Sequence, residues 1–366
     1  MSVTSRLFAI PWVMVGGIFI LVIIGTMALY SASDGVWTAS VQQHLIRSAL
    51  GFLLAVFIAF LPINWLFRAS FIIWFGFVAI LVALPFIGVG AGATRWIDLG
   101  FMNFQPSEPA KIAVVLLLAR YLSLRTFDQI DKFLIYIPAL LIAAIPSGLV
   151  LMQPDLGTGL MIFVAGLAVI FVSGLPKRYV LLGIAVVAAC IPIIWSQLYD
   201  YQKSRLLTFL NPEKDILGAG WQITQSKIAL GSGGLFGKGF LQGSQSQLDY
   251  LPEKQTDFVF TLIGEEFGFI GNSAIIFVYF LIIISITGIG LKAKNRFSRL
   301  VASGLAMVVF LYVFVNIAMV TGVMPVVGAP LPLLSYGGTA LLTVFIILGI
   351  SMNLSQNSQK EDLEIT

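Results

Sequence analysis

Long apolar runs alternate with short polar segments along almost the whole chain. A membrane core about 30 Å thick requires about 20 apolar residues in one helix. About ten runs approach or exceed this length, and they lie at 9–30, 48–63, 69–88, 104–122, 134–152, 157–175, 179–197, 257–291, 300–320 and 337–354. The run at 257–291 is long enough to contain a break or a strong tilt. The pattern predicts an all-α integral membrane protein, a polytopic bundle of about ten transmembrane helices within residues 1–354.

Lysine and arginine residues are unevenly distributed between the segments that connect these runs. If the N-terminus is cytoplasmic, the short outer segments contain only Arg47, Arg95 and Lys111. Cytoplasmic loops are rich in Lys and Arg, so the distribution predicts that both termini are cytoplasmic. The large loop at about 198–256 then faces outward, and residues 355–366 form a cytoplasmic tail. The first run is longer than the apolar part of a signal peptide, so we expect it to remain as an uncleaved helix.

The composition agrees with this class of protein and excludes several others. Of 366 residues, 58% are hydrophobic and 10% are charged, whereas about a quarter of the residues in a soluble domain are charged. The net charge of +4 comes without a Lys/Arg-rich run, so we expect no nucleic-acid partner. Cys190 and His44 are the only residues of their types, which excludes an internal disulfide and a histidine-cluster metal site.

Charged residues near the outer ends of the predicted helices are candidates for a functional site, because each costs roughly 3 kcal/mol at membrane depth. The first group contains Arg95, Glu108 and Lys111. Glu108 and Lys111 are three residues apart and therefore share one helix face. Ser107 has the chemistry of a helix N-cap. One interpretation is a structural ion pair with a cap, and the other is a buried polar site open to the outer leaflet.

The second group lies around Asp257, at the start of the eighth run, and includes Glu253. Thr256 or Asp257 could serve as a helix N-cap. Alternatively, a carboxylate at the mouth of a membrane cavity is suitably placed to act as a general base on a lipid-borne substrate. Glu265 and Glu266 lie about two turns deeper and do not pair with Asp257 on a straight helix. We expect them to have a helix-packing or proton-buffering role.

Residues 231–239 form the glycine-rich segment Gly-Ser-Gly-Gly-Leu-Phe-Gly-Lys-Gly within the outer loop. Its spacing fits neither a Walker phosphate loop nor a dinucleotide-binding turn. It could present backbone N–H groups to a phosphate, with Lys227 and Lys238 supplying positive charge, or it could be a flexible connector. The preceding segment 221–230 is too short to span a membrane, and the sequence leaves its conformation open.

Several spaced motifs together resemble those of a known family, the SEDS family, through nearly the whole chain. The motifs are Gln105-Pro106-Ser107-Glu108 with Lys111, Gln153-Pro154-Asp155-Leu156-Gly157, Ser226-Lys227-Ile228-Ala229-Leu230-Gly231-Ser232-Gly233-Gly234, Leu251-Pro252-Glu253, Thr256-Asp257-Phe258, and Pro330-Leu331-Pro332-Leu333 leading to Ser335-Tyr336-Gly337-Gly338. The segment from Gly322 to Gly328 resembles the elongation members of the family more than the division members. Thr339-Ala340 stands where a pair of serines is common.

The resemblance implies a peptidoglycan glycosyltransferase that polymerises lipid II on the outer face of the bacterial cytoplasmic (inner) membrane, during cell elongation and rod-shape maintenance. It implies partnership with a class B penicillin-binding protein, the cross-linking transpeptidase, and with other elongation-complex proteins. It also implies that Asp257 is the catalytic carboxylate and that Glu108 and Lys111 line the same outward cavity.

We therefore expect Asp257 to act as general base in an inverting transfer that releases undecaprenyl pyrophosphate. Glu108 would orient Lys111, and Glu253 is a further substrate-binding candidate. The candidates for binding the pyrophosphates are Arg47, Arg95, Lys111, Lys227 and Lys238. A leaving pyrophosphate also suggests Mg²⁺ or Mn²⁺, although the sequence contains no ligand cluster that would identify the metal.

Two alternatives belong to other functional classes. A lipid II flippase or transporter would also place charged residues in helices, but it needs polar residues across the full membrane depth, and here they cluster at the outer ends. A non-catalytic scaffold of the elongation machinery would only recruit the cross-linking enzyme. The scaffold hypothesis predicts that function survives when Asp257 is neutralised.

Overall fold

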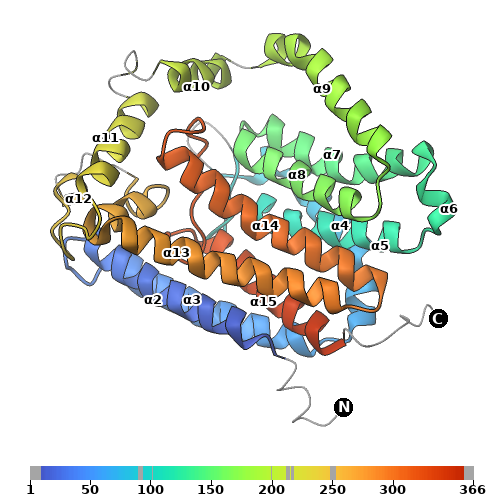
Figure 1. Ribbon diagram of the computed structural model, residues 1–366, viewed down its shortest axis with the longest axis horizontal. Helices are drawn as coiled ribbons and strands as arrows, with labels where there is room; N and C mark the ends of the chain where they lie inside the picture. The colour runs from blue at the N-terminus through green and yellow to red at the C-terminus, as the bar shows by residue number, and fades with distance from the viewer. Residues whose placement is uncertain are drawn as a thin grey trace.

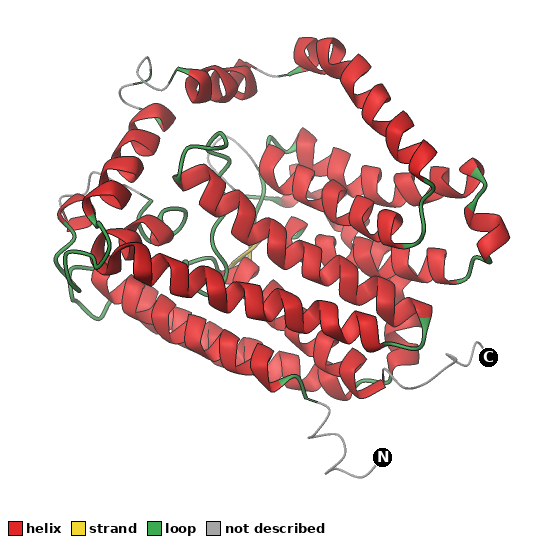
Figure 2. Cartoon of the chain, in the orientation of Figure 1, coloured by secondary structure: helices red, strands yellow, loops and turns green. Residues whose placement is uncertain are grey.

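The computed structural model describes residues 10–89, 94–100, 102–198, 200–211, 215, 218–247 and 253–357. Within these ranges the chain is almost entirely helical, and its long helices form a bundle (Figures 1 and 2). The long helices are α2 (Trp12–Ala32), α3 (Ala39–Phe60), α4 (Ile63–Ile87), α5 (Ser107–Ser123), α7 (Tyr136–Met152), α8 (Leu156–Val172), α9 (Lys177–Gln197), α13 (Val259–Lys292), α14 (Arg296–Val320) and α15 (Gly338–Asn357).

Shorter elements connect these helices. The strands β1 and β2 pair antiparallel and bring Ile97 opposite Phe104. The short elements are β1 (Ile97–Asp98), β2 (Asn103–Phe104), α6 (Phe127–Ile130), the 3-10 helix η1 (Phe133–Ile135), α10 (Asp200–Leu210), α11 (Ala219–Ser232) and α12 (Ser244–Gln247).

Each apolar run of the sequence corresponds to a helix in the described part of the chain, so the prediction of a polytopic all-α membrane protein is confirmed. Seven described helices are long and apolar enough to cross a membrane, namely α2, α3, α4, α7 together with η1, α13, α14 and α15. Helix α8 is apolar and shorter. Helix α5 has 17 residues and contains Glu108, Lys111 and Arg120. The remaining predicted span, α9, has 21 residues.

The boundaries of several runs differ from the prediction, among them those of α3 and α15. Helix α3 begins at Ala39 instead of about 48, because the polar residues Gln42, Gln43 and His44 continue the helix instead of ending it. His44 is fully enclosed, with 2% of its surface exposed. Helix α15 extends to Asn357, three residues beyond the predicted end of the membrane domain. The rest of the predicted tail, 358–366, lies outside the described residues.

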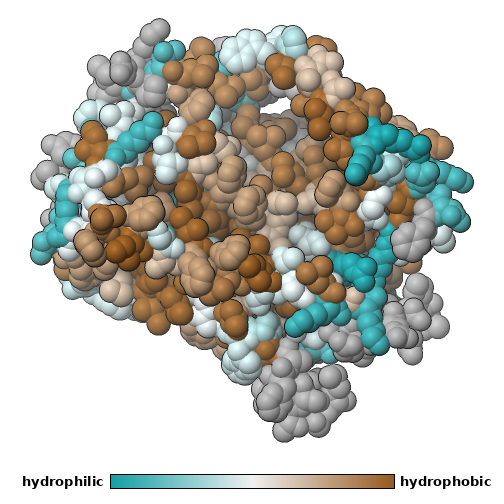
Figure 3. Space-filling view, in the orientation of Figure 1, coloured by the Kyte–Doolittle hydropathy of each residue, from teal (hydrophilic) through white to brown (hydrophobic). Residues whose placement is uncertain are grey.

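Helices α14 and α15 form the interior of the bundle, and α4 lies at its periphery. In the most apolar window of each helix, 72% of α14 and 78% of α15 is buried, against 17% of α4. Peripheral helices expose large apolar side chains such as Phe57 and Phe75. In Figure 3 hydrophobic residues cover a broad band of the surface, and hydrophilic residues gather at opposite edges of it. An exposed apolar band of this kind is stable only against lipid.

Of the break or strong tilt expected in the eighth run, the structure shows a break. At Gly268 the backbone of α13 has φ 70° and ψ −164°, which is not helical. The first part of α13 therefore ends at Phe267, and a second helical part continues to Lys292. Glycine is required here because this combination of angles is accessible almost only to a residue without a Cβ atom.

The long loop predicted at about 198–256 is largely helical where it is described. Helices α9, α10 and α11 form an arch along one edge of the molecule (Figure 1). The side chains of α9 are exposed over nearly its whole length, and the surface is hollowed between this arch and the bundle (Figure 3). Helix α11 contains segment 221–230 and packs against α13 and α14. That segment is thus a short helix attached to the bundle.

Candidate functional site

Most of the predicted site residues lie at one end of the bundle. Hydrogen bonds join the segments that form this end. The amide of Gln105 Nε2 reaches Asp155 at the start of α8, its backbone N–H reaches Thr339 in α15, and Tyr336 N donates to Gln255 O ahead of α13. The motifs at 105–111, 153–157, 253–258 and 330–338 are therefore brought together in space, although they are distant in sequence.

Asp257 lies just ahead of α13, next to the turn that carries Gly328. Asn316 Nδ2 donates hydrogen bonds to the carbonyl oxygens of Asp257 at 2.8 Å and of Ala329 at 2.7 Å, which fixes the backbone of Asp257 against that turn. The carboxylate lies over Gly328, where a Cβ atom would be 3.4 Å from Oδ2. Gly328 has φ 70°, so a larger residue would be strained and would also crowd the carboxylate.

The carboxylate of Asp257 does not cap α13. The N-cap position is Phe258, and no side chain makes a cap hydrogen bond there. Thr256 Oγ1 instead donates to Glu253 Oε2 at 2.8 Å. The N-cap interpretation of Thr256 and Asp257 is therefore wrong. Among the described residues, none donates a hydrogen bond to the Asp257 carboxylate, which leaves both oxygens able to accept a proton.

The surroundings of Asp257 favour a carboxyl group that exchanges a proton near neutral pH. Burial, the largest cause, and the negative charge of Glu253 together raise the pKa of Asp257 to about 7, against the opposing positive charge of Arg205 on α10. A general base is most effective when its pKa lies near the working pH. Arg205 was not among the predicted site residues, because the sequence gives no sign that α10 folds back towards Asp257.

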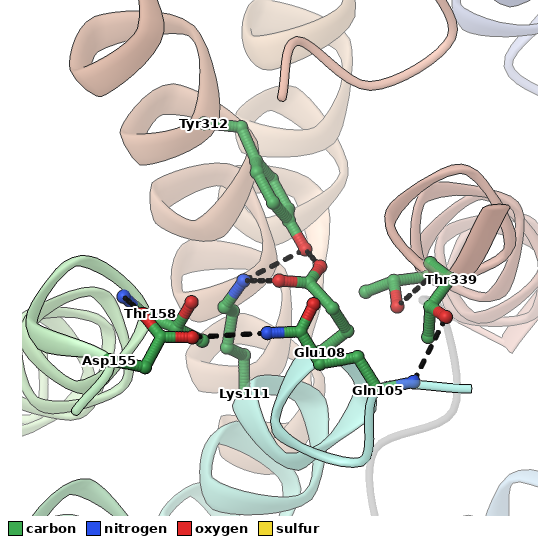
Figure 4. A network of polar contacts seen from close by, with 8 residues as sticks. Gln105, Glu108, Lys111, Asp155, Thr158, Tyr312 and Thr339 are labelled. Atoms are coloured by element: carbon green, nitrogen blue, oxygen red, sulfur yellow. Dashed lines mark hydrogen bonds and ion pairs between the residues drawn. The ribbon is translucent and has the colours of Figure 1, made fainter. Parts of the chain in front are cut away.

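Glu108 and Lys111 form a buried network with Tyr312 of α14 (Figure 4). Lys111 Nζ lies 2.6 Å from Glu108 Oε1 and donates to Tyr312 Oη at 3.0 Å, while Tyr312 Oη donates to Glu108 Oε2. The three side chains expose 5% of their surface or less. Both carboxylate oxygens and the ammonium are thus satisfied inside the protein. This geometry fits the structural ion pair, and substrate contact by Glu108 or Lys111 stays a prediction.

A second set of contacts borders this network in Figure 4. Gln105 Nε2 donates to Asp155 Oδ2 at 3.1 Å, and Asp155 Oδ1 accepts the N–H of Thr158 at 3.0 Å as the N-cap of α8. Thr339 Oγ1 accepts from Gln105 N at 3.1 Å, so this hydroxyl ties α15 to the start of α5. Ser107 is the first residue of α5 and not its N-cap, which is Pro106.

The two predicted arginines are both engaged with neighbouring protein groups. Arg95 Nε donates to the carbonyl of Gln153 at 2.8 Å, and its Nη2 donates to the carbonyl of Pro154. A cation at this position stabilises the C-terminal end of α7. Arg47 donates to Gln43 at 2.8 Å and stacks on Tyr336, with its guanidinium 5.1 Å from the ring centroid. Because Tyr336 N binds Gln255 O, Arg47 is linked to the segment that carries Asp257.

Lys227 and Lys238, the predicted lysines of the outer loop, lie in different surroundings. Lys227 on α11 is exposed and packs against Gly322, at the other end of the turn that reaches Gly328 beside Asp257. Lys238 instead forms an ion pair with the fully buried Glu265 at 2.7 Å. The structure therefore places Lys227, an exposed residue, at the same end of the bundle as Asp257, whereas Lys238 forms an ion pair inside the protein.

The glycine-rich segment 231–239 binds the break in α13 and is not a flexible connector. The interruption at Gly268 leaves backbone groups without helical partners, and the segment satisfies four of them. The bonds, at 2.9 to 3.2 Å, join the N–H groups of Lys238, Gly239, Phe269 and Ile270 to the carbonyl groups of Glu265, Glu266, Gly234 and Leu235, respectively. The N–H groups of Lys238 and Gly239, which the phosphate-binding alternative would use, are occupied by protein.

Among the described residues, no group of three His, Cys, Asp or Glu side chains is arranged to hold a metal ion. Asp257 and Glu253 are two carboxylates close enough to influence each other. Two hard oxygen ligands are fewer than the six that Mg²⁺ requires, so waters and phosphate oxygens of a substrate would have to supply the rest. A Mg²⁺ or Mn²⁺ ion at this place stays a prediction.

The fold and the site define a class of proteins, polytopic α-helical membrane proteins with a carboxylate site at one end of the bundle. A family model described as "Cell cycle protein", for FtsW, RodA and SpoVE, matches residues 5–360. The chain therefore belongs to the FtsW/RodA/SpoVE family, the SEDS family. The resemblance seen in the sequence motifs is confirmed.

Similar proteins and structures agree with this membership. The peptidoglycan glycosyltransferase MrdB of Escherichia coli K12 is 43% identical over 91% of this chain and 92% of its own length. Stage V sporulation protein E of Bacillus subtilis is 34% identical over 93% and 95%. A chain of a peptidoglycan synthase complex that coordinates polymerization and crosslinking superposes with a TM-score of 0.83 at 30% identity, covering 95% of this chain and 98% of that one. Thermus thermophilus RodA gives a TM-score of 0.72 at 28% identity, covering 95% and 97%.

Proposed function

We propose that this chain is a peptidoglycan glycosyltransferase of the elongation (RodA) type, which polymerises lipid II into β-1,4 glycan strands. The family and the named activity of MrdB support the class of reaction. The observation that carries the proposal for this chain is the state of Asp257. Its carboxylate is half-buried, has no hydrogen-bond donor among the described residues and has its pKa raised to about 7 by burial.

In the proposed reaction, Asp257 takes the proton from the 4-hydroxyl of the acceptor GlcNAc. The oxygen attacks C1 of the donor MurNAc and forms the new glycosidic bond. The bond from C1 to the phosphate oxygen breaks with its electron pair, and undecaprenyl pyrophosphate leaves. Attack opposite the leaving group converts the α-linked donor into a β-linked product by inversion. The raised pKa of Asp257 supports this role, because a base near neutrality removes a hydroxyl proton more effectively than an ordinary carboxylate.

The cations differ in how well they could bind the leaving pyrophosphate. Lys227 is exposed and packs on Gly322, in the segment that leads to Gly328 beside Asp257, and Arg205 lies within electrostatic reach of the carboxylate. Arg47 stacks on Tyr336. By contrast, Arg95, Lys111 and Lys238 are bound by protein carbonyl or carboxylate groups. We therefore place Lys227 and Arg205 first among the pyrophosphate contacts, with Mg²⁺ or Mn²⁺ supplying further charge neutralisation when bound.

The cellular setting follows from the same proposal. The protein lies in the bacterial inner membrane with the Asp257 end facing outward and with both termini in the cytoplasm. Helix α2 begins and α15 ends on the same side of the molecule (Figure 1), which supports an even number of spans. A class B penicillin-binding protein is the proposed cross-linking partner. The similarity to a chain of a synthase complex that coordinates polymerization and crosslinking supports it.

A lipid II flippase is the strongest alternative, and the positions of the buried acids weigh against it. A transport path requires polar groups accessible across the full depth of the bundle. Glu265 and Glu266, the deeper acids, are sealed from solvent, and their Oε1 atoms are bound by Lys238, Ser244, Gln245, Leu241 and Ser31. A scaffold without activity would give no reason for a carboxylate held unpaired beside Gly328.

The test is glycan-chain formation from labelled lipid II by the purified full-length chain, alone and with a class B penicillin-binding protein. We expect polymer from wild type and none from Asp257→Ala at equal amounts of folded protein. Equal polymer from both variants would remove Asp257 from the chemistry. Absence of polymer from wild type in both settings, combined with lipid II translocation into proteoliposomes, would support the flippase instead.

A further inference from the structure

Side chains strengthen the contact between the glycine-rich segment and the break in α13. Glu265 is completely buried, and its Oε1 accepts hydrogen bonds from Lys238 Nζ at 2.7 Å, Ser244 Oγ at 3.2 Å and Gln245 N at 2.9 Å. These donors all belong to the segment that leaves the glycine-rich turn. Through these bonds Glu265 attaches residues 238–245 to the end of the first part of α13.

Glu266 makes a parallel set of contacts from the adjacent position. Its Oε1 accepts the backbone N–H of Leu241 at 3.2 Å and the hydroxyl of Ser31 at the end of α2. Glu266 is also enclosed, with 1% of its surface exposed. The expected helix-packing role of these two acids therefore takes a specific form, in which both bind the loop that precedes them in the sequence.

Glycines make the backbones approach closely enough for these bonds. A Cβ atom on Gly233 would overlap the carbonyl oxygen of Gly264, and one on Gly237 would overlap that of Glu266. Gly237 also has φ 82°, which favours glycine. The segment is rich in glycine because two backbones come into direct contact, which requires residues without side chains.

Asp257 lies between the two parts of the chain that this contact joins. The chain leaves the contact after Gln245, reaches Asp257, and returns along the first part of α13 to Glu265. On the other side, Asn316 binds the carbonyl of Asp257, and Tyr336 N binds Gln255 O. The backbone at Asp257 is thus held to the bundle by Asn316 and Tyr336, and in the sequence Asp257 lies between residues 238–245 and Glu265, which the contact joins.

We propose that Lys238 and Glu265 are positioning residues for Asp257, whose ion pair holds residues 238–245 against the helix that follows Asp257. This inference rests on the proposed function, in which Asp257 is the base. The ion pair suits such a role because the Glu265 carboxylate is fully enclosed while Lys238 is 28% exposed. Without the ammonium, the buried carboxylate loses this ion pair, which weakens the attachment of residues 238–245 to α13.

The decisive variants are Lys238→Met and Lys238→Arg in the full-length chain. Lys238→Met keeps the apolar stem and removes the charge, so we expect kcat for lipid II polymerisation to fall about tenfold, with KM changed less than about twofold, because the base is displaced and substrate binding is not. Lys238→Arg keeps the charge and should recover most of the rate. Lys177→Met, at the exposed start of α9, is the matched control and should behave as wild type.

A pH profile separates positioning from general stability. Asp257 is faced by Glu253 and by Arg205, and its pKa is raised mainly by burial. A looser segment admits water to Asp257, so the acid limb of kcat should move to lower pH in Lys238→Met and remain in place in Lys177→Met. The proposal fails if kcat and the acid limb are unchanged in Lys238→Met. It also fails if activity falls only in proportion to folded protein, with Lys238→Arg equally impaired.

A measurement without catalysis distinguishes this inference from the proposed function. In an Asp257→Cys, Cys190→Ser background, the reaction rate of the new thiol with a water-soluble maleimide reports how tightly position 257 is held. We expect a several-fold faster reaction after Lys238→Met and no change after Lys177→Met. Equal rates in all three proteins would overturn the positioning role even if wild type polymerises lipid II. If wild type forms no polymer but Lys238→Met still speeds the maleimide reaction, the positioning role is supported and the polymerase function is rejected.

Discussion

Asp257 and Glu108 are carboxylates at the same end of the bundle, and their surroundings are opposite in the properties that determine reactivity. Glu108 is bound by an ammonium and a phenol and is sealed from solvent. Asp257 is half-buried, is held through its backbone, and has no donor to its side chain among the described residues. A carboxylate that already has its partners is stable and inert, whereas one that is desolvated without partners is ready to accept a proton.

The largest expected effect is the loss of catalysis when Asp257 is neutralised. Asp257→Asn keeps the size of the side chain and removes the base, so polymerisation should fall by at least about a hundredfold. The thermal midpoint of unfolding should not decrease, because no hydrogen bond to the carboxylate is lost. Polymerisation from lipid II and thermal unfolding of the same preparation check both parts. A lower thermal midpoint, with polymerisation reduced only in proportion to the loss of folded protein, would assign Asp257 a structural role.

Removing a charge from the Glu108–Lys111 pair should lower the stability of the fold before it affects catalysis. Lys111→Met leaves the Glu108 carboxylate buried without its cation, which should destabilise the fold by about 3–5 kcal/mol. The double variant Glu108→Gln, Lys111→Met removes both charges and should regain most of that loss. Thermal unfolding in one detergent measures both proteins. A stable Lys111→Met protein that has lost polymerisation would place Lys111 in contact with substrate.

A smaller effect is expected for the phenol that joins the pair. Tyr312→Phe removes the hydroxyl that contacts both charged groups and should lower the free energy of unfolding by about 1–2 kcal/mol. Tyr121→Phe, which loses one partly buried bond to the carbonyl of Ile135, is the control and should lose less. The two midpoints of thermal unfolding give the comparison. An equal loss of stability in both proteins would show that the Tyr312 hydroxyl gains nothing from its contact with the charged pair.

The smallest expected effects are shifts in the pH dependence of kcat. Asp257 must be ionised to act as a base, so activity should fall as pH decreases through its pKa of about 7. The negative charge of Glu253 disfavours ionisation and raises that pKa, so Glu253→Gln should move the acid limb to lower pH. Arg205→Gln should move it to higher pH, because Arg205 favours the ionised form.

A pH series of initial polymerisation rates measures these shifts, and Asp131→Asn is the control. Asp131 forms an exposed ion pair with Arg178 beside α9, on a different part of the molecule. Its replacement should leave the acid limb in place. Shifts of the same sign in Glu253→Gln and Arg205→Gln would contradict the assignment of the limb to Asp257.

The sequence predicted those features that depend on local pattern. The apolar runs gave the helices, because the bilayer sets a minimum length for any spanning helix. The excess length of the eighth run indicated the break at Gly268. The motifs around Glu108 and Asp257 indicated both polar clusters, since charged residues in such a chain stand out from an apolar background. The start of α3 was predicted wrongly, because apolarity alone does not show that polar residues such as His44 are buried.

The tertiary structure determined which of these residues became partners. Tyr312 lies far from Glu108 and Lys111 in the sequence, and only the packing of α14 against α5 places its hydroxyl between them. The glycine-rich segment has no local pattern that identifies the break in α13 as its partner, because backbone hydrogen bonds carry no side-chain signature. The raised pKa of Asp257 likewise follows from burial and from the charges of Glu253 and Arg205, which are properties of the folded chain and not of its order of residues.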